Sequence, residues 1–372
     1  MYMTLQRSFP DLQSLNLPLT CYYEAPITED LAMRYWNEAF SITGLTELVL
    51  ELNSDEIVED DLINKVLEYL LTGCPNLIDL AICISSNPDT SFFYIPELFE
   101  RATWYSLRRL TIGENITALP TSFSATDLHD TSKIFAEFLS RHDRLERLYL
   151  KTTHQLCPHY CFPRDGLPEL RSLMMDIRNS AYESYIYCDC PDSLLPKHIA
   201  RNLESLCIIR AYDSQDPVHT IMPALRTLKE DAFSLSNLLH IVDRHPYLEK
   251  LSISMHRSEC ETDIFDPPQL QRPWDKEYFI TILSRLKNLT HLFVRELFDD
   301  ELEYLIDLII EQIPSLRYIG FSPTATMSDS DAWYIFDRFE NGELKWLVEE
   351  SVQYSKEDII LRWGEFFSEI PA

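Results

Sequence analysis

The sequence predicts an α/β solenoid, in which short repeats of one strand and one helix stack along a single axis. The first observation is a signature, Leu-x-x-Leu-x-apolar, that recurs twelve times along the 372 residues. The second is a mean period of about 30 residues between copies, which is typical of solenoid repeats. The third is that the intervening segments show the three- and four-residue apolar spacing of helices. The copies begin at Leu12, Leu45, Leu77, Leu107, Leu145, Leu170, Leu203, Leu225, Leu248, Leu289, Leu316 and Leu344.

The three defined positions of the signature, here called slots one, two and three, have different roles. Slot one is Leu in all twelve copies, slot two in eleven, and slot three is apolar in ten, with Glu230 and Glu349 as the exceptions. Slots two and three are two residues apart, so their side chains share one face of a strand. Slot one belongs to the turn before the strand and also points inward. Because one repeat cannot bury three apolar side chains alone, the repeats are expected to stack as a leucine-rich-repeat domain.

The segments between the signatures predict helices at residues 28–40, 60–71, 130–140 and 275–286. Ser328 and Asp331 fit a capping box and predict the start of another helix. In six repeats a Pro lies two residues before slot one, where it is expected to end the preceding helix. The alternative is that the signature itself belongs to an amphipathic helix, since slots one and two have a helical spacing. That alternative does not explain why the same triplet recurs at twelve sites.

Stacked repeats of strand, loop and helix require consecutive strands to run parallel. We expect about twelve irregular repeats in one domain over residues 1–372, with strands lining the concave side of a right-handed curved solenoid and helices on the convex side. Unequal repeat lengths predict long loops around 120–126 and 259–273, and an irregular excursion at 180–194. A helical stripe of Ile360, Trp363, Phe367 and Ile370 predicts that residues 351–372 form a helix capping the last repeat.

The composition indicates which kinds of partner the protein can bind and in which cellular compartment it is expected. The net charge is −28, from 32 basic and 60 acidic residues, which argues against nucleic acid because its binding requires clustered positive charge. No run of 18 apolar residues is present, so we expect no membrane span. The N-terminus lacks the apolar run of a signal peptide. The nine cysteines are therefore expected to be reduced thiols of a cytoplasmic or nuclear protein.

No sequence motif indicates catalysis or a cofactor. Seven glycines do not assemble a Gly-rich phosphate loop or a dinucleotide fingerprint. Neither the nucleophile elbow of hydrolases nor the paired-histidine helix of metalloproteases is present. We therefore expect a protein that is not an enzyme and holds no cofactor. A hydrolase whose site is built from loops on one rim is the remote alternative.

Cysteine and histidine gather in one region as a possible zinc site. Cys157 and Cys161 have a spacing compatible with zinc, and Cys188 and Cys190 follow about one repeat later, while His154 and His159 lie beside the first pair. Equivalent loops of adjacent repeats could meet, and zinc accepts four thiolate or imidazole ligands tetrahedrally. The alternative is ordinary core cysteines, since Cys-x-Cys is an awkward chelate and neither half has zinc-finger spacing. Zinc binding stays open, and we assign no metal site.

Two four-residue segments, 74–77 (Cys-Pro-Asn-Leu) and 313–316 (Ile-Pro-Ser-Leu), lead into predicted strands in the same way. Irregular repeats of this kind resemble the C-terminal half of fungal F-box proteins, over nearly the whole chain but in architecture rather than in individual residues. Members of that family typically act as substrate receptors of Skp–cullin ubiquitin ligases. The resemblance therefore implies a protein-binding scaffold that recognises a ligase substrate, with a Skp-type adaptor as partner only through an F-box.

The start of the repeats bears on that resemblance. The first repeat begins by Phe9, which leaves no room before it for an F-box of about 45 residues. We expect either a truncated receptor or a free-standing leucine-rich-repeat adaptor that works in a multiprotein complex without a ubiquitin-ligase role.

Side chains just before slot two, between slots two and three, and just after slot three are expected on the concave face. Of these 36 positions six are basic and six acidic, so this face is richer in positive charge than the whole chain. Adjacent repeats bring together a candidate partner-binding surface of Arg109, Arg147, Tyr149, Lys151 and Met174. Arginine forks and an aromatic ring suit an acidic or phosphorylated protein or peptide. The alternative is that the arginines only pair with acidic side chains of neighbouring helices.

Overall fold

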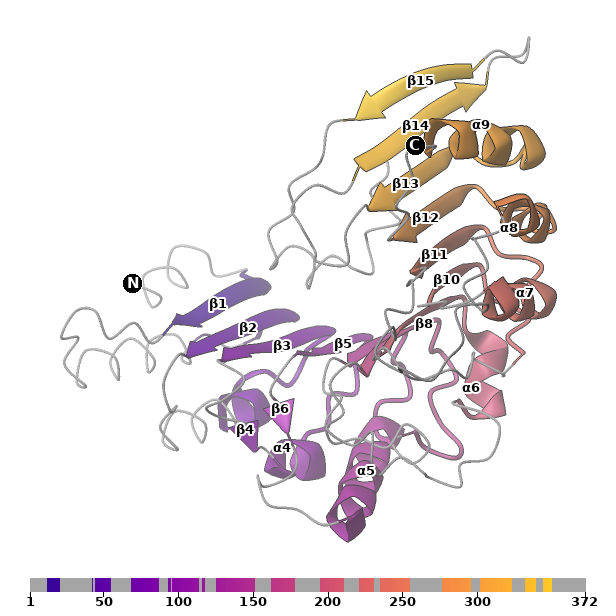
Figure 1. The fold of residues 1–372 in the computed structure, drawn as a ribbon. Helices are drawn as coiled ribbons and strands as arrows, with labels where there is room; N and C mark the ends of the chain where they lie inside the picture. Colours follow the sequence, from indigo (N-terminus) through magenta and orange to yellow (C-terminus); the bar gives the residue numbers. More distant parts are fainter. Residues whose placement is uncertain are drawn as a thin grey trace, which may run out of the picture. The chain divides into compact units, whose positions relative to one another are not determined.

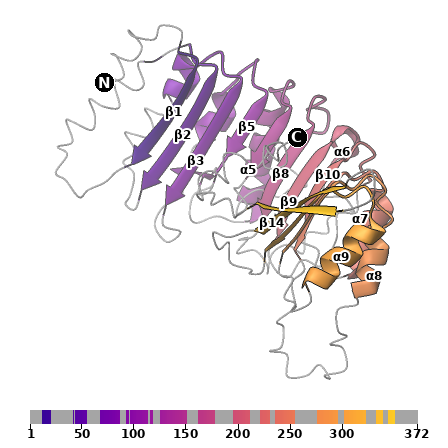
Figure 2. The ribbon, with the colours of Figure 1, turned by 90° about the horizontal axis from the view of Figure 1, so that it is seen from above.

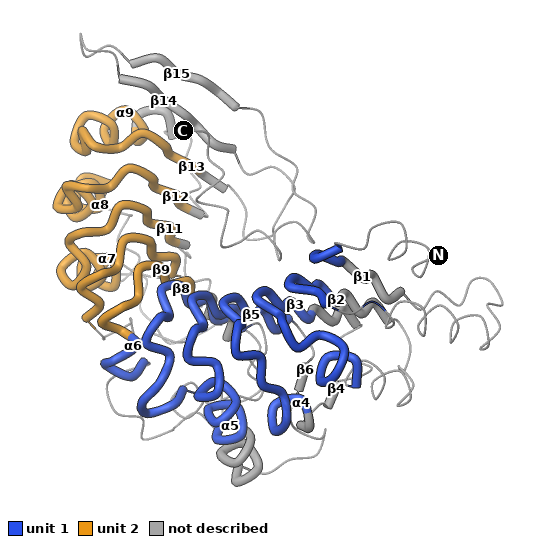
Figure 3. The backbone as a smooth tube through the Cα atoms, turned by 180° about the vertical axis from the view of Figure 1, so that it is seen from behind, with its two compact units in different colours: residues 1–199 blue, residues 200–372 orange. Residues whose placement is uncertain are grey.

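The structure is a computed structural model. It describes residues 12–20, 42, 44–54, 68–86, 93–94, 96–113, 116–117, 125–150, 162–177, 195–210, 221–230, 235–254, 276–295, 302–322, 332–338 and 344–349. The chain divides into two compact units, residues 1–199 (unit 1) and 200–372 (unit 2) (Figure 3). The single domain expected from the sequence stays a prediction.

Unit 1 contains an open sheet of parallel strands. Its strands, in spatial order, are β1 (Ser14–Thr20), β2 (Glu47–Ser54), β3 (Asp79–Ser86), β5 (Arg109–Ile112), β7 (Arg147–Leu150) and β8 (Ser172–Ile177). Each pairs in parallel with the next, and Figure 2 shows β1, β2 and β3 side by side. The helical elements are a π-helical turn, η1 (Tyr69–Gly73), and the helices α4 (Pro96–Arg101) and α5 (Ala125–Ser140). Two short strands, β4 (Phe93–Tyr94) and β6 (Ile116–Thr117), pair separately.

Unit 2 continues the same alternation of strand and helix. Its parallel strands are β9 (Ser205–Arg210), β10 (Thr227–Glu230), β11 (Lys250–Ser254), β12 (His291–Arg295) and β13 (Tyr318–Ser322). The helices α7 (Leu235–Arg244), α8 (Lys276–Leu283) and α9 (Leu302–Gln312) form one layer against this sheet (Figure 1). Helix α6 (Lys197–Asn202) contains the boundary between the units. The described strands and helices confirm an α/β fold with open parallel sheets.

The signature residues are aligned from strand to strand. In unit 1 the slot-two leucines are register partners in the order Leu15, Leu48, Leu80, Leu110, Leu148 and Leu173. In unit 2 the order is Leu206, Leu228, Leu251, Leu292 and Ile319. All are buried, at 9% exposure or less, and the slot-one leucines from Leu45 to Leu316 are buried with them. The hydrophobic core therefore consists of these rows together with the apolar sides of the helices.

A regular hydrogen-bond step sets this alignment. In five pairs of neighbouring repeats of unit 1 and four of unit 2, the carbonyl oxygen of the residue after slot one accepts two backbone N–H groups from the next repeat, at 2.7–3.1 Å. For example, the carbonyl of Arg108 accepts the N–H groups of Glu146 and Arg147. Each new strand is thus held at the same height as the one before it, which places equivalent side chains next to one another.

A fourth buried position precedes each signature and was missed by our sequence analysis. The residue three before slot one is buried in all ten described repeats in which it lies: Ile42, Cys74, Trp104, His142, Leu167, Ala200, Met222, His245, Leu286 and Ile313. In seven of them its carbonyl oxygen accepts the N–H of the slot-one leucine, at 3.0–3.3 Å. The residue types differ too much for a motif search to align them, although the turn is the same.

The predictions for individual helices have mixed outcomes. Helix α5 contains the predicted 130–140 and begins earlier, at Ala125, and α8 lies within the predicted 275–286. Of 60–71 only 68–71 are described, and they are helical. The predicted helix 28–40, the capping helix 351–372 and the excursions 180–194 and 259–273 lie outside the described residues. The predicted effect of proline is confirmed where α7 and α9 end shortly before Pro246 and Pro314.

The expectation of parallel strands throughout is wrong for the last two strands. β14 (Ala332–Arg338) pairs antiparallel with β13, and β15 (Leu344–Glu349) pairs antiparallel with β14. Ser328 and Asp331 were predicted to begin a helix, but β14 starts directly after them. The physical reason is loop length. Nine residues (323–331) separate β13 from β14 and five (339–343) separate β14 from β15, whereas a parallel crossover needs a dozen or more.

Slot three contains one polar exception within the described core. Glu230 lies between Ile208 and Ile253 in the register of its row and is 2% exposed. The second exception, Glu349, belongs to β15, where slot one already lies within the strand. The last copy of the signature therefore does not form a repeat of the same geometry.

The aligned core makes a direct prediction for stability. Leu110→Ala should lower the free energy of unfolding by about 2–5 kcal/mol, because it leaves a cavity in the slot-two row. Thr111→Ala, one residue away on the opposite face of β5, should cost less than about 1 kcal/mol. Guanidinium chloride unfolding followed by tryptophan fluorescence compares the two variants with the wild type. Equal unfolding midpoints for the two variants would contradict the assignment of β5 faces.

Candidate functional site

The helices and the rows of slots two and three occupy one face of each sheet. The opposite face, here called the open face, carries the residue before slot two and the residue between slots two and three. Because the register is constant, these residues form rows across neighbouring strands, about 4.8 Å from one another. The open face of each unit is therefore the candidate binding surface.

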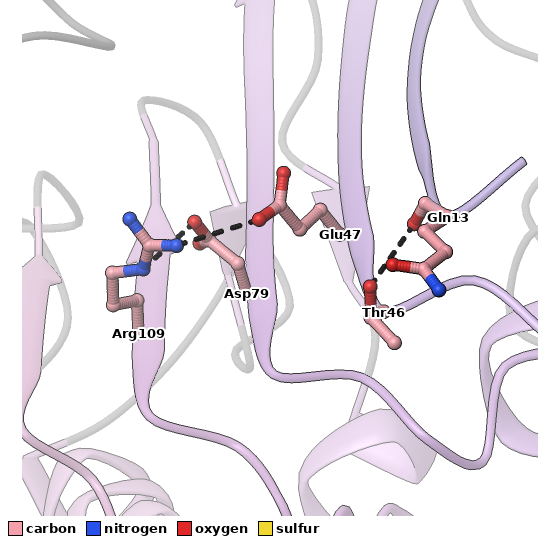
Figure 4. A network of polar contacts seen from close by, with 5 residues as sticks. All are labelled: Gln13, Thr46, Glu47, Asp79 and Arg109. Carbon is pink, nitrogen blue, oxygen red and sulfur yellow. Dashed lines mark hydrogen bonds and ion pairs between the residues drawn. The ribbon is translucent and has the colours of Figure 1, made fainter.

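On the open face of unit 1, Arg109 joins three strands (Figure 4). Its Nε lies 2.9 Å from Oδ2 of Asp79 on β3, and its Nη2 lies 3.6 Å from Oε1 of Glu47 on β2. These three residues are register partners. Beside them, the Thr46 hydroxyl donates to the carbonyl oxygen of Gln13, at 3.3 Å. Arg109 thus pairs with acids of adjacent strands rather than helices, and its charge is balanced on the face itself.

The other predicted site residues lie on the next two strands. Arg147 is the register partner of Arg109, and it is exposed, with no ion pair among the described residues. Tyr149 is half-buried and pairs in register with Met174. Met174 is 9% exposed, so it offers little surface to a partner. Lys151 lies outside the described residues. The structure therefore brings together Arg109, Arg147, Tyr149 and Met174.

A buried histidine fixes the turns that lead into these strands. Trp104 and His142 both occupy the position three before slot one, ahead of β5 and β7 respectively. His142 Nε2 accepts the backbone N–H of Trp104 at 3.0 Å, and its Nδ1 donates to the carbonyl oxygen of Phe138 at 2.8 Å. Edge-on contacts of Phe138 with Phe99 and Trp104 surround this pair. Both imidazole nitrogens are therefore occupied, and the starts of two adjacent site strands are tied together.

This arrangement requires a neutral imidazole. Burial lowers the pKa of His142 from 6.5 to about 4, and burial does the same for His245 at the equivalent position of unit 2. Protonation of His142 at Nε2 would remove the acceptor for the N–H of Trp104. Between pH 6.5 and about 4, His142 therefore binds a proton in the unfolded state but not in the folded state.

The stability of unit 1 should consequently fall as the pH drops from 6.5 to about 4. In that window the unfolded state binds the proton and the folded state does not, so stability rises with pH and levels off above 6.5. His142→Gln should remove a part of this dependence worth about 3 kcal/mol. His240→Gln, at an exposed position of α7, is the control. Urea unfolding at several pH values measures the slopes, and identical slopes for wild type and His142→Gln would refute the role.

The open face of unit 2 contains a site that sequence analysis passed over. Lys250, His291 and Tyr318 are register partners on β11, β12 and β13, and each is half-buried. The rings of His291 and Tyr318 stack with centroids 4.3 Å apart at an interplanar angle of 14°. The neighbouring row, Lys229, Ser252, Phe293 and Gly320, is buried. Counting basic side chains did not find this site, because its aromatic members and its register become evident only in the structure.

The expectations about zinc binding and membrane spans concern residues beyond the two open faces. Cys157, Cys161, Cys188 and Cys190 lie outside them, and no group of three potential metal ligands occurs within them. No described helix is long and apolar enough to cross a membrane. No protein-family model matches the chain, and no curated protein matches it.

Proposed function

We propose that this protein is a leucine-rich-repeat scaffold of about twelve irregular repeats that binds a protein or peptide partner through its open sheet face. The observation that carries the proposal is the strict register of the open-face rows. One sheet face is used for the core, while the other presents polar, charged and aromatic side chains at the same height on successive strands. A surface of this kind suits an extended partner, because each strand offers an equivalent contact.

In unit 1 the contact residue that stands out is Arg147. Arg109 is balanced by Asp79 and Glu47, and its reversal to Glu would place three carboxylates together. Arg147 is exposed and carries no such neutralising pair among the described residues, while Tyr149 lies on the same strand. A guanidinium fork next to an aromatic ring can hold a carboxylate or a phosphate of the partner.

Arg147→Glu should therefore weaken partner binding without affecting folding. We expect a loss of about tenfold to a hundredfold in affinity, as for a charge-assisted hydrogen bond. Quantitative affinity capture from cells that express the protein, followed by titration with each captured partner, measures the effect. Arg147→Lys retains the charge but not the fork, and should show an intermediate loss.

Arg144→Glu is the matched control, because it makes the same charge change at an exposed turn residue three positions away. Thermal melts of all variants should be the same. If Arg147→Glu retains every partner at wild-type affinity, the open face of unit 1 is not the recognition surface.

We also propose that the partner is the substrate of a Skp–cullin ubiquitin ligase. The support is architectural: the Pro-containing segments 74–77 and 313–316 lead into irregular repeats of strand and helix, and the resemblance to F-box receptors rests on repeats of this kind. Immunoprecipitation of the full-length gene product should then recover a Skp-type adaptor. Recovery of stable complexes without any adaptor would favour the free-standing scaffold instead.

A further inference from the structure

The inference concerns two open-face residues of β7, Arg147 and Tyr149. They are two positions apart on one strand, so their side chains point to the same side, about 6.6 Å from each other along the strand. Leu148, which lies between them, is 1% exposed and belongs to the core. Arg147 is exposed and Tyr149 is half-buried, so a partner can contact both from the open face.

The row that contains Tyr149 is uncharged. It consists of the residues between slots two and three, which in unit 1 are the register partners Val49, Ala81, Thr111, Tyr149 and Met174. Ala81 and Met174 are 6% and 9% exposed, and the other three are half-buried. A partner side chain that lies on the ring of Tyr149 therefore meets a mainly apolar strip rather than a second ionic group.

The charge of Arg147 is not compensated by its described neighbours. Its register partners are Arg109 and Ser172, neither of which is acidic. Glu146, the adjacent acid in sequence, is in an ion pair with Arg108 at 2.8 Å. Among the described residues no ion pair involves Arg147. Arg147 therefore offers a positive charge directly beside the uncharged strip.

We propose that the open face over β7 binds an extended peptide segment with an acidic and an apolar residue two positions apart, the acid at Arg147 and the apolar side chain on Tyr149. Side chains of an extended segment alternate and advance about 3.3 Å per residue. Residues two apart thus point to the same side with the spacing of the two contacts. The segment runs along β7, in either chain direction, rather than across the strands. This proposal rests on the proposed function and adds the side-chain pattern of the partner.

The single guanidinium of Arg147 matches a carboxylate better than a phosphate. A phosphate carries nearly two negative charges and is bound best where several donors converge. The other guanidinium of the row, that of Arg109, is occupied by Asp79 at 2.9 Å and Glu47 at 3.6 Å. These two contacts bring carboxylates to the row instead of a second available cation. The acidic residue of the partner is therefore expected to be Asp or Glu.

A small set of peptides tests the pattern by surface plasmon resonance, with the full chain as analyte at low salt. The immobilised peptides share an uncharged Ser/Thr/Gly background and contain Glu-x-Leu, Gln-x-Leu, Glu-x-Ser or the adjacent pair Glu-Leu. The adjacent pair retains both side chains but points them to opposite sides. The chain should bind Glu-x-Leu most tightly, and each of the others about threefold to fivefold more weakly.

Two variants assign the contacts. Arg147→Gln should lose the preference for Glu-x-Leu over Gln-x-Leu and retain the preference over Glu-x-Ser. Tyr149→Ser should do the reverse, because it removes the apolar contact and leaves the charge. Arg144→Gln and Tyr105→Ser, at exposed turn residues of the same unit, are the matched controls and should retain both preferences. Thermal melts establish that each variant is folded, and the comparison of wild type with Arg147→Gln is decisive even if Tyr149→Ser does not fold.

Four results would overturn the proposal. One is the absence of saturable binding of Glu-x-Leu up to about 1 mM. Another is equal binding of Glu-x-Leu and the adjacent pair, since the two side chains would then not be bound from one side. The third is an Arg147→Gln variant that still prefers Glu-x-Leu over Gln-x-Leu. The fourth is binding of a phosphoserine-x-Leu peptide more than about tenfold tighter than Glu-x-Leu, which would indicate convergent donors.

The capture experiment with Arg147→Glu uses natural partners rather than these peptides. Failure of the peptide pattern therefore leaves the proposed function standing, whereas a variant that retains every natural partner contradicts both.

Discussion

The constraint on which the rest of the structure depends is the repeated carbonyl step after slot one. A single oxygen accepts two N–H groups from the next repeat, so each strand begins at the same height as its predecessor. The slot-two leucines of neighbouring strands therefore lie side by side. Because side chains alternate along a strand, the residues directly before and after slot two point to the open face. A shift by one residue would exchange the core and the open face in every following repeat. Core and binding surface are therefore fixed by the same bonds.

This constraint explains which parts of the fold could be predicted from the sequence. The rows of slots one and two could be predicted, because leucine is nearly invariant there and the period-two spacing identifies a strand. The buried position ahead of slot one could not, since Trp104, His142 and Ala200 share only their turn geometry. The antiparallel β14 and β15 were missed for another reason. The last triplet at Leu344 obeys the signature, and only the short segment before β14 indicates that no crossover helix fits.

The candidate sites show the same limit. Arg109 and Arg147 were both predicted as open-face residues, and register places them on adjacent strands. Sequence analysis did not separate their roles, because it considered acids of neighbouring helices as partners of the arginines and not Asp79, which the signature places beside Arg109. The stacked rings of His291 and Tyr318 were missed for a related reason. Both residues precede slot two of consecutive repeats, so the signature aligns them, but only charged side chains were compared along these positions.

Row composition then decides which parts of the two open faces can recognise charge. Neighbours in a row are close enough for ion pairs, so a row that contains both signs neutralises itself, as Arg109 does with Asp79 and Glu47. The ion pairs of such a row stabilise the sheet only weakly, because their members are partly exposed. Because its charges are already paired, the row attracts a charged partner only weakly. Arg147, which forms no ion pair among the described residues, keeps its attraction for an acidic group, and its charge is opposite to the net charge of −28 of the chain. An acidic group of a partner is therefore drawn to such a position rather than to a row that is already balanced, which restricts where an acidic partner can bind.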